Sequence, residues 1–331
     1  MTTHTPPLRF GILGAARIAP IALVRPARLV PDASVVAIAA RDPERARKFA
    51  AKHGIARVHP SYDALLADPE VDAIYNPLPN SLHRDWTIRA LEAGKHVLCE
   101  KPMASNAAEA EEMAEAARRT GRLLAEAFHY RYHPLAARMK AIVESGELGP
   151  IRHIEAHLCF VLPSPGNIRY RHELAGGATM DAGCYAISLV RFLAGAEPEV
   201  IRAEARVASP QVDRWMGADF RFPDGRTGRI TCALLSAALF RASARVRGDR
   251  GDMRVLNPYA PQLLHRLRVR NDQHQFVERV RGEATYTHQL RAFVAAIRGG
   301  PPIPTSPDDA IANMRVIDAV YEKAGLRKRG K

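Results

Sequence analysis

The sequence predicts an α/β fold with two domains: a doubly wound parallel sheet at residues 1–127 and a mostly antiparallel open sheet, with helices on one face, at residues 128–331. Two observations lead to this prediction. In the first part, short apolar runs alternate with helical segments, which is typical of parallel sheets. In the second part, strand-like runs follow one another directly, which is typical of antiparallel sheets. The 331 residues are sufficient for two domains with a large core.

The elements of the first part are apolar runs bounded by turn residues. The run Leu-Arg-Phe-Gly-Ile-Leu at 8–13 is typical of a buried parallel strand. Ser81 is a candidate N-cap for a helix that Gly94 ends, and Gly121 ends the next helix. The predicted strands are 8–13, 35–40, 73–75, 96–99 and 123–127, and the predicted helices are 43–52, 81–92 and 107–120.

The second part begins after about Phe128 and contains most of the predicted antiparallel strands. Pro-Asp-Gly between Phe222 and Arg226 predicts a hairpin turn. Ser306 and Pro307 predict the start of the last helix, since they combine a cap with a proline in its first turn. The predicted strands are 151–161, 200–208, 216–222, 228–236 and 241–248, with helices at 133–145 and 176–193 and a loop at 163–166.

The composition and charge exclude several classes of protein. With 47% hydrophobic and 25% charged residues, the chain has the composition of a globular protein. No apolar run is long enough for a transmembrane helix, and no secretory signal is visible, so we expect a cytoplasmic protein. The four cysteines lie among apolar residues and form no Cys-x-x-Cys pair, so we expect buried free thiols.

The net charge of +13 is spread along the chain, apart from one basic cluster at 327–331. We interpret this cluster as a frayed, solvated tail. A nucleic-acid binder would have a basic stripe or a recognisable binding module, and the sequence shows neither. A basic protein does attract anionic ligands, and a phosphorylated cofactor is one of them.

The first strand is followed by a turn of the kind that binds dinucleotides. Gly14-Ala15-Ala16-Arg17-Ile18-Ala19 stands between a predicted strand and the start of a helix. The usual pattern has a second glycine, which lets the backbone approach a pyrophosphate, where this chain has Ala16. A purely structural strand-to-helix turn is the alternative. The position at the first strand-to-helix turn favours cofactor binding by Gly14, Ala16, Arg17 and Ile18.

The end of the second strand discriminates between NADP and NAD. An NAD site has an acid here for the ribose hydroxyls, whereas an NADP site has an arginine for the 2′-phosphate. Arg41 occupies this position, and Arg45 follows about one helical turn later. The alternative is a surface arginine that pairs with Asp42 or Glu44. We therefore predict NADP as the cofactor, with NAD as the alternative.

Two further segments carry candidate catalytic groups. Lys101 follows a predicted strand and precedes Pro102, which ends the strand, so the lysine is placed at the edge where open α/β sheets bind ligands. The alternative is an ordinary surface lysine. Asp181 and Tyr185 are four residues apart, so they share one face of a helix that starts at a double glycine. Here the alternative is a buried tyrosine beside a capping aspartate.

These motifs in this order resemble the glucose–fructose oxidoreductase / inositol dehydrogenase (Gfo/Idh/MocA) family over nearly the whole chain. The form with Tyr185, where many members have histidine, is similar to the branch of dimeric dihydrodiol dehydrogenases and NADP-dependent D-xylose dehydrogenases. The resemblance implies an N-terminal Rossmann domain and a reacting centre at Lys101, Asp181 and Tyr185. The motifs that carry the resemblance are Gly11 to Ala19, Pro77-Leu-Pro79-Asn80 with His83, Glu100-Lys101-Pro102, Gly176-Gly177 with Asp181, and Glu126 to Arg131.

The expected function is therefore NADP-dependent hydride transfer between nicotinamide and a hydroxyl or hemiacetal of a sugar or polyol. The further cofactor-binding candidates, Pro77, Asn80, His83 and Glu100, follow the third strand or end the fourth. Two alternatives remain open: a carbonyl reductase on the same fold, and a cofactor-binding sensor without turnover.

We expect no metal site and no partner other than a small-molecule substrate and further copies of the chain. The pairs His153 and His157, and His129 and His133, have i, i+4 spacing. On a strand, however, residues four apart are about 13 Å from each other, too far for one ion. The exposed face of the second sheet requires a partner, so we expect a homodimer or homotetramer.

Overall fold

The computed structural model describes residues 6–163, 166–235 and 240–330, which form two compact units. Unit 1 comprises the chain up to Ala104, Ala108–His129 and Tyr286–Ala310. Unit 2 comprises Ser105–Ala107, Tyr130–Thr285 and the chain from Ile311 onward. A single boundary near residue 127 was predicted; the structure adds a return of the chain to unit 1 at residues 286–310.

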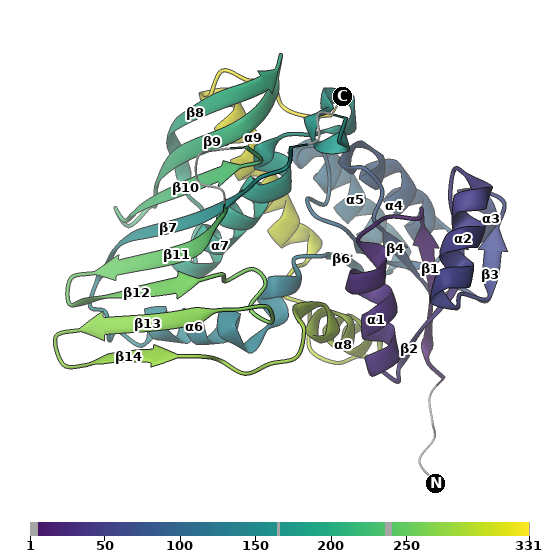
Figure 1. Ribbon diagram of the computed structural model, residues 1–331, viewed down its shortest axis with the longest axis horizontal. Helices are drawn as coiled ribbons and strands as arrows, with labels where there is room; N and C mark the ends of the chain where they lie inside the picture. The colour runs from purple at the N-terminus through teal and green to yellow at the C-terminus, as the bar shows by residue number, and fades with distance from the viewer. Residues whose placement is uncertain (1–5, 164–165, 236–239, 331) are drawn as a thin grey trace, which may run out of the picture. The chain divides into compact units, whose positions relative to one another are not determined.

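Unit 1 contains a six-stranded sheet in which every neighbouring pair of strands is parallel (Figure 1). The strand order β3-β2-β1-β4-β5-β6 reverses direction between β1 and β4, as in the doubly wound fold that the sequence predicts. The strands are β1 (Leu8–Leu13), β2 (Ala33–Ala39), β3 (Arg57–His59), β4 (Ala73–Asn76), β5 (His96–Cys99) and β6 (Leu124–Glu126).

The core of unit 1 explains why residues 286–310 belong to it. Phe10 of β1 packs against Phe293 of α8, with ring centroids 5.9 Å apart. Leu23 and Leu290 are fully buried in the same cluster. The apolar side chains of α8 therefore complete this core. The helices of unit 1 are α1 (Arg25–Leu29), α2 (Pro43–His53), α3 (Tyr62–Leu66), α4 (His83–Glu92), α5 (Ala107–Thr120) and α8 (Thr285–Ile297).

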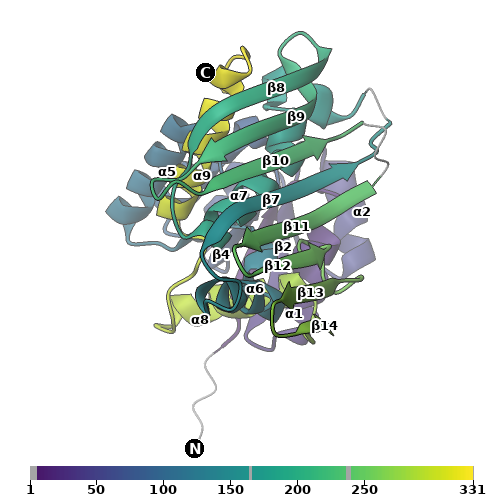
Figure 2. The same cartoon turned by 90° about the vertical axis from the view of Figure 1, so that its left-hand side faces the viewer.

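Unit 2 contains an eight-stranded sheet in the order β14-β13-β12-β11-β7-β10-β9-β8 (Figure 2). All neighbours are antiparallel except β10 and β7, which are parallel. Helix α7 packs against β7 and β10, and α6 packs against α7, so these helices lie on one face of the sheet. The strands are β7 (Ile151–Phe160), β8 (Glu199–Ser209), β9 (Val212–Arg221), β10 (Thr227–Ala233), β11 (Phe240–Gly248), β12 (Gly251–Leu256), β13 (Arg266–Asn271) and β14 (Gln275–Glu278), and the helices are α6 (Pro134–Glu144), α7 (Cys184–Ala194) and α9 (Pro307–Lys323).

The structure confirms the fold class and corrects several local predictions. Ser81 lies inside a short 3₁₀ turn and does not cap α4, whose N-cap is Leu82. Within the predicted loop 163–166 and strand 228–236, Ser164, Pro165 and Ser236 lie outside the described residues. The elements that were not predicted from the sequence are β3, α3, β12, β13, β14 and α8.

The C-terminal segment is the clearest correction. Within the described part of the segment predicted to be a frayed tail, Arg329 is buried, with an accessible fraction of 1%. The prediction failed because the partner of its guanidinium, Asp213, is distant in the sequence. In the described part of the chain, no helix is long and apolar enough to cross a membrane. All four cysteines are buried free thiols, as predicted.

Candidate active site

The turn after β1 has the tight geometry that the sequence predicts for a dinucleotide site. Gly14 has a φ of +84°, which favours glycine, and its N–H donates to the carbonyl of Ala39 over 2.7 Å. A Cβ added at Gly14 would lie 3.1 Å from Cδ2 of Leu78 and 3.6 Å from the Tyr62 hydroxyl. The missing side chain therefore keeps the backbone of this turn close to its neighbours.

The residues after Gly14 lead into a helix, as predicted. The carbonyl of Ala16 accepts a hydrogen bond from Ala19 N–H over 3.2 Å, and that of Ile18 accepts one from Ala22 N–H over 3.0 Å. A π-helical turn begins at Pro20 and continues into α1. Arg17 is exposed beside this turn, where a cationic side chain is available to an anionic ligand.

The end of β2 presents arginines, while the nearby acid has a structural role. Asp42 is the N-cap of α2, because its Oδ1 accepts hydrogen bonds from Glu44 N–H at 3.0 Å and Arg45 N–H at 3.2 Å. Arg41 is exposed and forms no ion pair with any described residue. Arg45 Nη2 reaches back to the carbonyl of Ala15 at 3.5 Å. The two arginines and the first turn thus belong to one surface of unit 1.

Tyr62 is a residue of this surface that the sequence analysis missed. Its ring packs edge-on against Trp86, with centroids 4.7 Å apart. Burial raises the pKa of the Tyr62 phenol, although the positive charges of Arg41 and Arg45 oppose this. Ser61, whose hydroxyl oxygen accepts from Ala64 N–H over 3.1 Å, caps the short α3 and was the available sequence signal.

Polar contacts of the Asn76 and His83 side chains fix the loop after β4. The Asn76 amide donates to Thr87 Oγ1 over 3.1 Å, and its oxygen accepts from Leu78 N–H over 3.3 Å. His83 is fully buried, with Nδ1 2.9 Å from the carbonyl oxygen of Pro102 and Nε2 2.7 Å from that of Leu78. His83 therefore joins the β4 loop to the segment after β5.

Lys101 follows the end of β5, as predicted, and is half-buried. Glu100 beside it accepts a hydrogen bond from the Tyr75 hydroxyl over 2.7 Å, which fixes the carboxylate. The Lys101 backbone N–H lies 3.3 Å from the other carboxylate oxygen, and the Lys101–Pro102 peptide bond is cis. Burial lowers the pKa of His129 to about 3, and the Lys101 charge adds to this effect.

In unit 2, the double glycine, Asp181 and Tyr185 lie on one continuous segment. A π-helical turn at Thr179–Gly183 precedes α7, so Asp181 is in the turn and Tyr185 is in the helix. Asp181 accepts a hydrogen bond from Arg169 Nε over 2.6 Å, a partner that the sequence analysis did not identify. Tyr185 is 8% exposed, and its ring centroid lies 5.6 Å from that of Tyr259.

The candidate residues thus form two groups. The structure gathers the candidate cofactor-binding residues and Lys101 in unit 1, and it places Asp181 and Tyr185 in unit 2. Within the residues that the structure describes, no group of three or more histidine, cysteine or acidic side chains could hold a metal ion.

Comparison with known proteins identifies the family. The model of an oxidoreductase family with an NAD-binding Rossmann fold matches residues 8–128, and the model of the GFO/IDH/MocA C-terminal domain matches residues 136–254. The chain belongs to the Gfo/Idh/MocA oxidoreductase family.

Three relatives show which members of this family the chain is similar to. An NADP-dependent D-xylose 1-dehydrogenase of Haloferax volcanii is 34% identical, over 96% of this chain and 97% of that protein. A trans-1,2-dihydrobenzene-1,2-diol dehydrogenase of Sus scrofa is 34% identical, over 76% of this chain and 75% of that protein. The crystal structure of a 3-ketoreductase from Actinomadura kijaniata, in complex with NADP and TDP-benzene, has a TM-score of 0.88 at 29% identity and covers 98% of this chain and 99% of that one.

Proposed function

We propose that this protein is an NADP-dependent oxidoreductase that acts on a hydroxyl or hemiacetal group of a sugar or polyol. The observation that carries the proposal is the pairing of a dinucleotide turn at Gly14 with exposed arginines at the end of β2. The substrate class rests on the named relatives, which include a D-xylose dehydrogenase and a dihydrodiol dehydrogenase.

The residues of unit 1 fit NADP. Gly14 lets the turn approach Leu78, because a Cβ there would lie 3.1 Å from a Leu78 methyl group. A pyrophosphate would bind at the start of the helix that follows, over Ala16, Arg17 and Ile18. Arg41 and Arg45 would hold the 2′-phosphate, because a guanidinium binds phosphate with two parallel hydrogen bonds. Pro77, Asn80 and Glu100 would border the nicotinamide end, and we assign the fully buried His83 to supporting their loop. When bound, NADP supplies the two-electron acceptor for the oxidation.

Three side chains would carry out the proton transfer. Tyr185, as phenolate, accepts the proton of the substrate hydroxyl while the carbon that bears it is oxidised. The Lys101 ammonium stabilises the phenolate and so lowers the tyrosine pKa from its ordinary value of about 10. Asp181 orients the substrate hydroxyls. Its hydrogen bond with Arg169 fixes the carboxylate for this role.

A carbonyl reductase is the second candidate, because the A. kijaniata relative is a 3-ketoreductase. The same residues serve both directions. In reduction, Tyr185 donates the proton that it accepts in oxidation. A cofactor-binding sensor without turnover is the third alternative, and it differs from both enzymes in leaving the bound cofactor chemically unchanged.

The test is a screen of aldoses, polyols and the corresponding ketoses with NADP, NADPH and NAD, followed by absorbance of the reduced nicotinamide. We expect turnover that falls at least about a hundredfold in Lys101→Met, with NADP binding retained. The double variant Lys101→Met/Tyr185→Phe should lose much less than the two single losses combined, because groups that act as a unit are non-additive.

Lys48→Met is the matched control, since Lys48 is exposed on α2 and pairs only with Glu44 among the described residues. Wild-type turnover in Lys101→Met would refute the assignment. Binding of NADP without turnover on any substrate of the panel would favour the sensor. Turnover only with ketoses and NADPH would favour the reductase.

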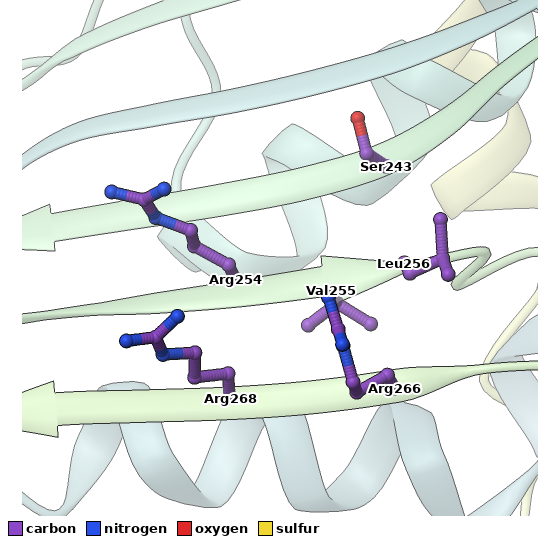
Figure 3. A pocket seen from close by; sticks show the side chains of 6 residues that line it. All are labelled: Ser243, Arg254, Val255, Leu256, Arg266 and Arg268. Atoms are coloured by element: carbon purple, nitrogen blue, oxygen red, sulfur yellow. The ribbon is translucent and has the colours of Figure 1, made fainter. Parts of the chain in front are cut away.

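We also propose that the open face of the unit 2 sheet forms a homodimer interface. Figure 3 shows a hollow on this face, lined by residues of β11, β12 and β13. Arg254 and Arg268 are directly opposite each other there, and Arg254 pairs with Asp252 while Arg268 donates to Gln275. Leu256 and Val277 are 40% and 57% exposed on the same face.

Light scattering should therefore give a particle of at least twice the chain mass of 36.4 kDa. The variant Leu256→Glu/Val277→Glu should reduce this mass to that of one chain. A monomeric wild-type protein would contradict the dimer without affecting the proposed chemistry.

A further inference from the structure

A buried cluster in unit 2 ties the C-terminal segment to the turn that carries Asp181. Arg329 and Asp213 are both 0% exposed in their side chains, and Arg329 Nη2 lies 3.0 Å from Asp213 Oδ1. Arg329 Nε also donates to the carbonyl of Gly176 over 2.8 Å. The guanidinium lies over the ring of Tyr321, 4.0 Å from its centroid. The segment from Arg327 to Gly330 is thus anchored at its centre.

Asp213 connects this arginine to the start of the π-helical turn. Its Oδ2 accepts two hydrogen bonds from Thr179, from the backbone N–H and from the hydroxyl, each over 2.7 Å. Its Oδ1 accepts a hydrogen bond from the Tyr321 hydroxyl over 2.9 Å as well as that from Arg329. One carboxylate therefore fixes strand β9, helix α9, the C-terminal segment and the first residue of the turn.

The same cluster explains Gly177, the second residue of the double glycine. A Cβ at Gly177 would lie 2.2 Å from Asp213 Oδ1 and 2.7 Å from the Tyr321 hydroxyl, and Gly177 has a φ of +139°. A Cβ at Gly176 would lie 2.6 Å from the carbonyl oxygen of Arg169. Gly177 therefore has no room for a side chain beside the cluster, and Gly176 has none beside the backbone of Arg169.

The geometry points to Arg329 as a positioning residue that, through Asp213 and Thr179, sets the place of Asp181 and Tyr185. The connection is short. Asp213 holds Thr179, and the Asp181 N–H donates to the Gly177 carbonyl over 3.1 Å. The Arg169 carbonyl accepts a hydrogen bond from Gly177 N–H over 2.8 Å. The Arg169 side chain also binds the Asp181 carboxylate. This inference rests on the proposed function of Asp181 and Tyr185.

Anchoring a chain end with a buried ion pair has a high cost in free energy, since each charge loses its hydration. An apolar side chain would anchor the segment equally well but would leave the Asp213 carboxylate buried without a counter-charge. Arg329 therefore supplies the counter-charge at Asp213 Oδ1, while Asp213 Oδ2 accepts two hydrogen bonds from Thr179. Because one oxygen of Asp213 binds Arg329 and the other binds Thr179, the ion pair positions the π-helical turn as well as the C-terminal segment.

The test compares Arg329→Met and Arg329→Lys with the matched control Arg327→Met, whose side chain is exposed two residues earlier. Hydrogen exchange of a peptide that spans 176–185 gives a readout that needs no substrate. We expect faster exchange of this peptide in Arg329→Met, an intermediate rate in Arg329→Lys and the wild-type rate in Arg327→Met. Wild-type exchange in a folded Arg329→Met protein would overturn the inference.

Turnover supplies the second readout, with the sugar or ketose that gives the highest rate in the screen above. Arg329→Met should lower kcat at least about tenfold while NADPH affinity, measured by the fluorescence of its reduced nicotinamide, changes less than about twofold. In a Tyr185→Phe background the same substitution should have little further effect on kcat, because the residue acts through the turn that places Tyr185. An equal loss in both backgrounds would assign Arg329 to general stability and overturn its positioning role.

One further variant and one further criterion separate the remaining outcomes. If Arg329→Met does not fold, Arg329→Met/Asp213→Asn removes both buried charges together, and the same exchange and turnover criteria apply to it. If Tyr185→Phe retains wild-type turnover, the proposed function fails, whereas hydrogen exchange at 176–185 still decides whether Arg329 holds the turn.

Discussion

His83 offers a prediction whose size follows from the structure. Burial lowers its pKa from 6.5 to about 4, outweighing the two carbonyl oxygens of Pro102 and Leu78 that face the ring nitrogens and the smaller effect of the Lys101 charge. In the unfolded chain the same ring has the ordinary value. Below pH 6.5 the unfolded state therefore takes up a proton that the native state does not, so His83 reduces stability as the pH falls from 6.5 to about 4.

The magnitude follows from the two pKa values. One pKa unit corresponds to about 1.4 kcal/mol, so His83 should cost about 2.5 kcal/mol of unfolding free energy between pH 7.5 and pH 4.5. The substitution His83→Gln removes the titrating ring but retains an amide that can donate to one carbonyl. We expect the variant to be less stable at neutral pH, yet to lose about 2.5 kcal/mol less than the wild type over this pH range.

Urea unfolding monitored by circular dichroism at several pH values measures this difference. His274→Gln, an exposed position on the β13–β14 hairpin, is the matched control and should follow the wild-type curve. The buried His129 contributes in the same direction in all three proteins, so the comparison isolates His83. Parallel curves for wild type and His83→Gln would show that the native ring titrates with its ordinary pKa and would refute the reasoning.

Three other predictions address cofactor, chemistry and backbone. Arg41→Ala should weaken NADP binding by about 1–3 kcal/mol, measured by fluorescence titration, with little change for NAD; equal losses for both cofactors would refute its phosphate role. In the oxidation direction, kcat/KM should rise with pH through an apparent pKa below about 10, and this limb should be absent in Tyr185→Phe; a limb that survives with the same midpoint would assign the base to another residue. Gly177→Ala should destabilise the protein by at least about 2 kcal/mol, because its Cβ would lie against a buried carboxylate, whereas Gly225→Ala, at a φ of +84° with nothing within 4 Å, should cost only about 1 kcal/mol; equal losses in thermal unfolding would contradict the packing argument.

The sequence was most informative where an apolar run alone determines a buried strand. The central strands β1, β4 and β5 are buried on both faces, so they appear as continuous apolar segments. The strand β3, with only Arg57-Val-His59, is too short to give a pattern. The strands β12 and β13, next to the edge strand β14, were not predicted, although Arg266-Leu-Arg-Val-Arg of β13 alternates between charged and apolar residues.

The candidate site was predictable where one residue type is required by local chemistry. The glycine of the first turn and the arginine after β2 were visible because each has a position relative to a strand. Arg329 could not be found this way, since 116 residues separate it from Asp213 and a basic tail has the composition of a solvated segment. Arg169 could not be identified from the sequence either, because its pairing with Asp181 depends on how a loop folds and not on a regular spacing in the sequence.

The capping role of Asp42 has a consequence for attempts to change the cofactor preference. Replacing Arg41 with a neutral residue would leave Asp42 as the ribose-binding acid of an NAD enzyme. The Asp42 carboxylate would then have to cap α2 and bind the ribose at the same time. Its oxygen already accepts from the first turn of α2, at 3.0 and 3.2 Å. Turning it toward a ribose would uncap that helix, at a cost of about 1 kcal/mol. The economical route to an NAD enzyme is therefore a new acid at position 41, with Asp42 left unchanged.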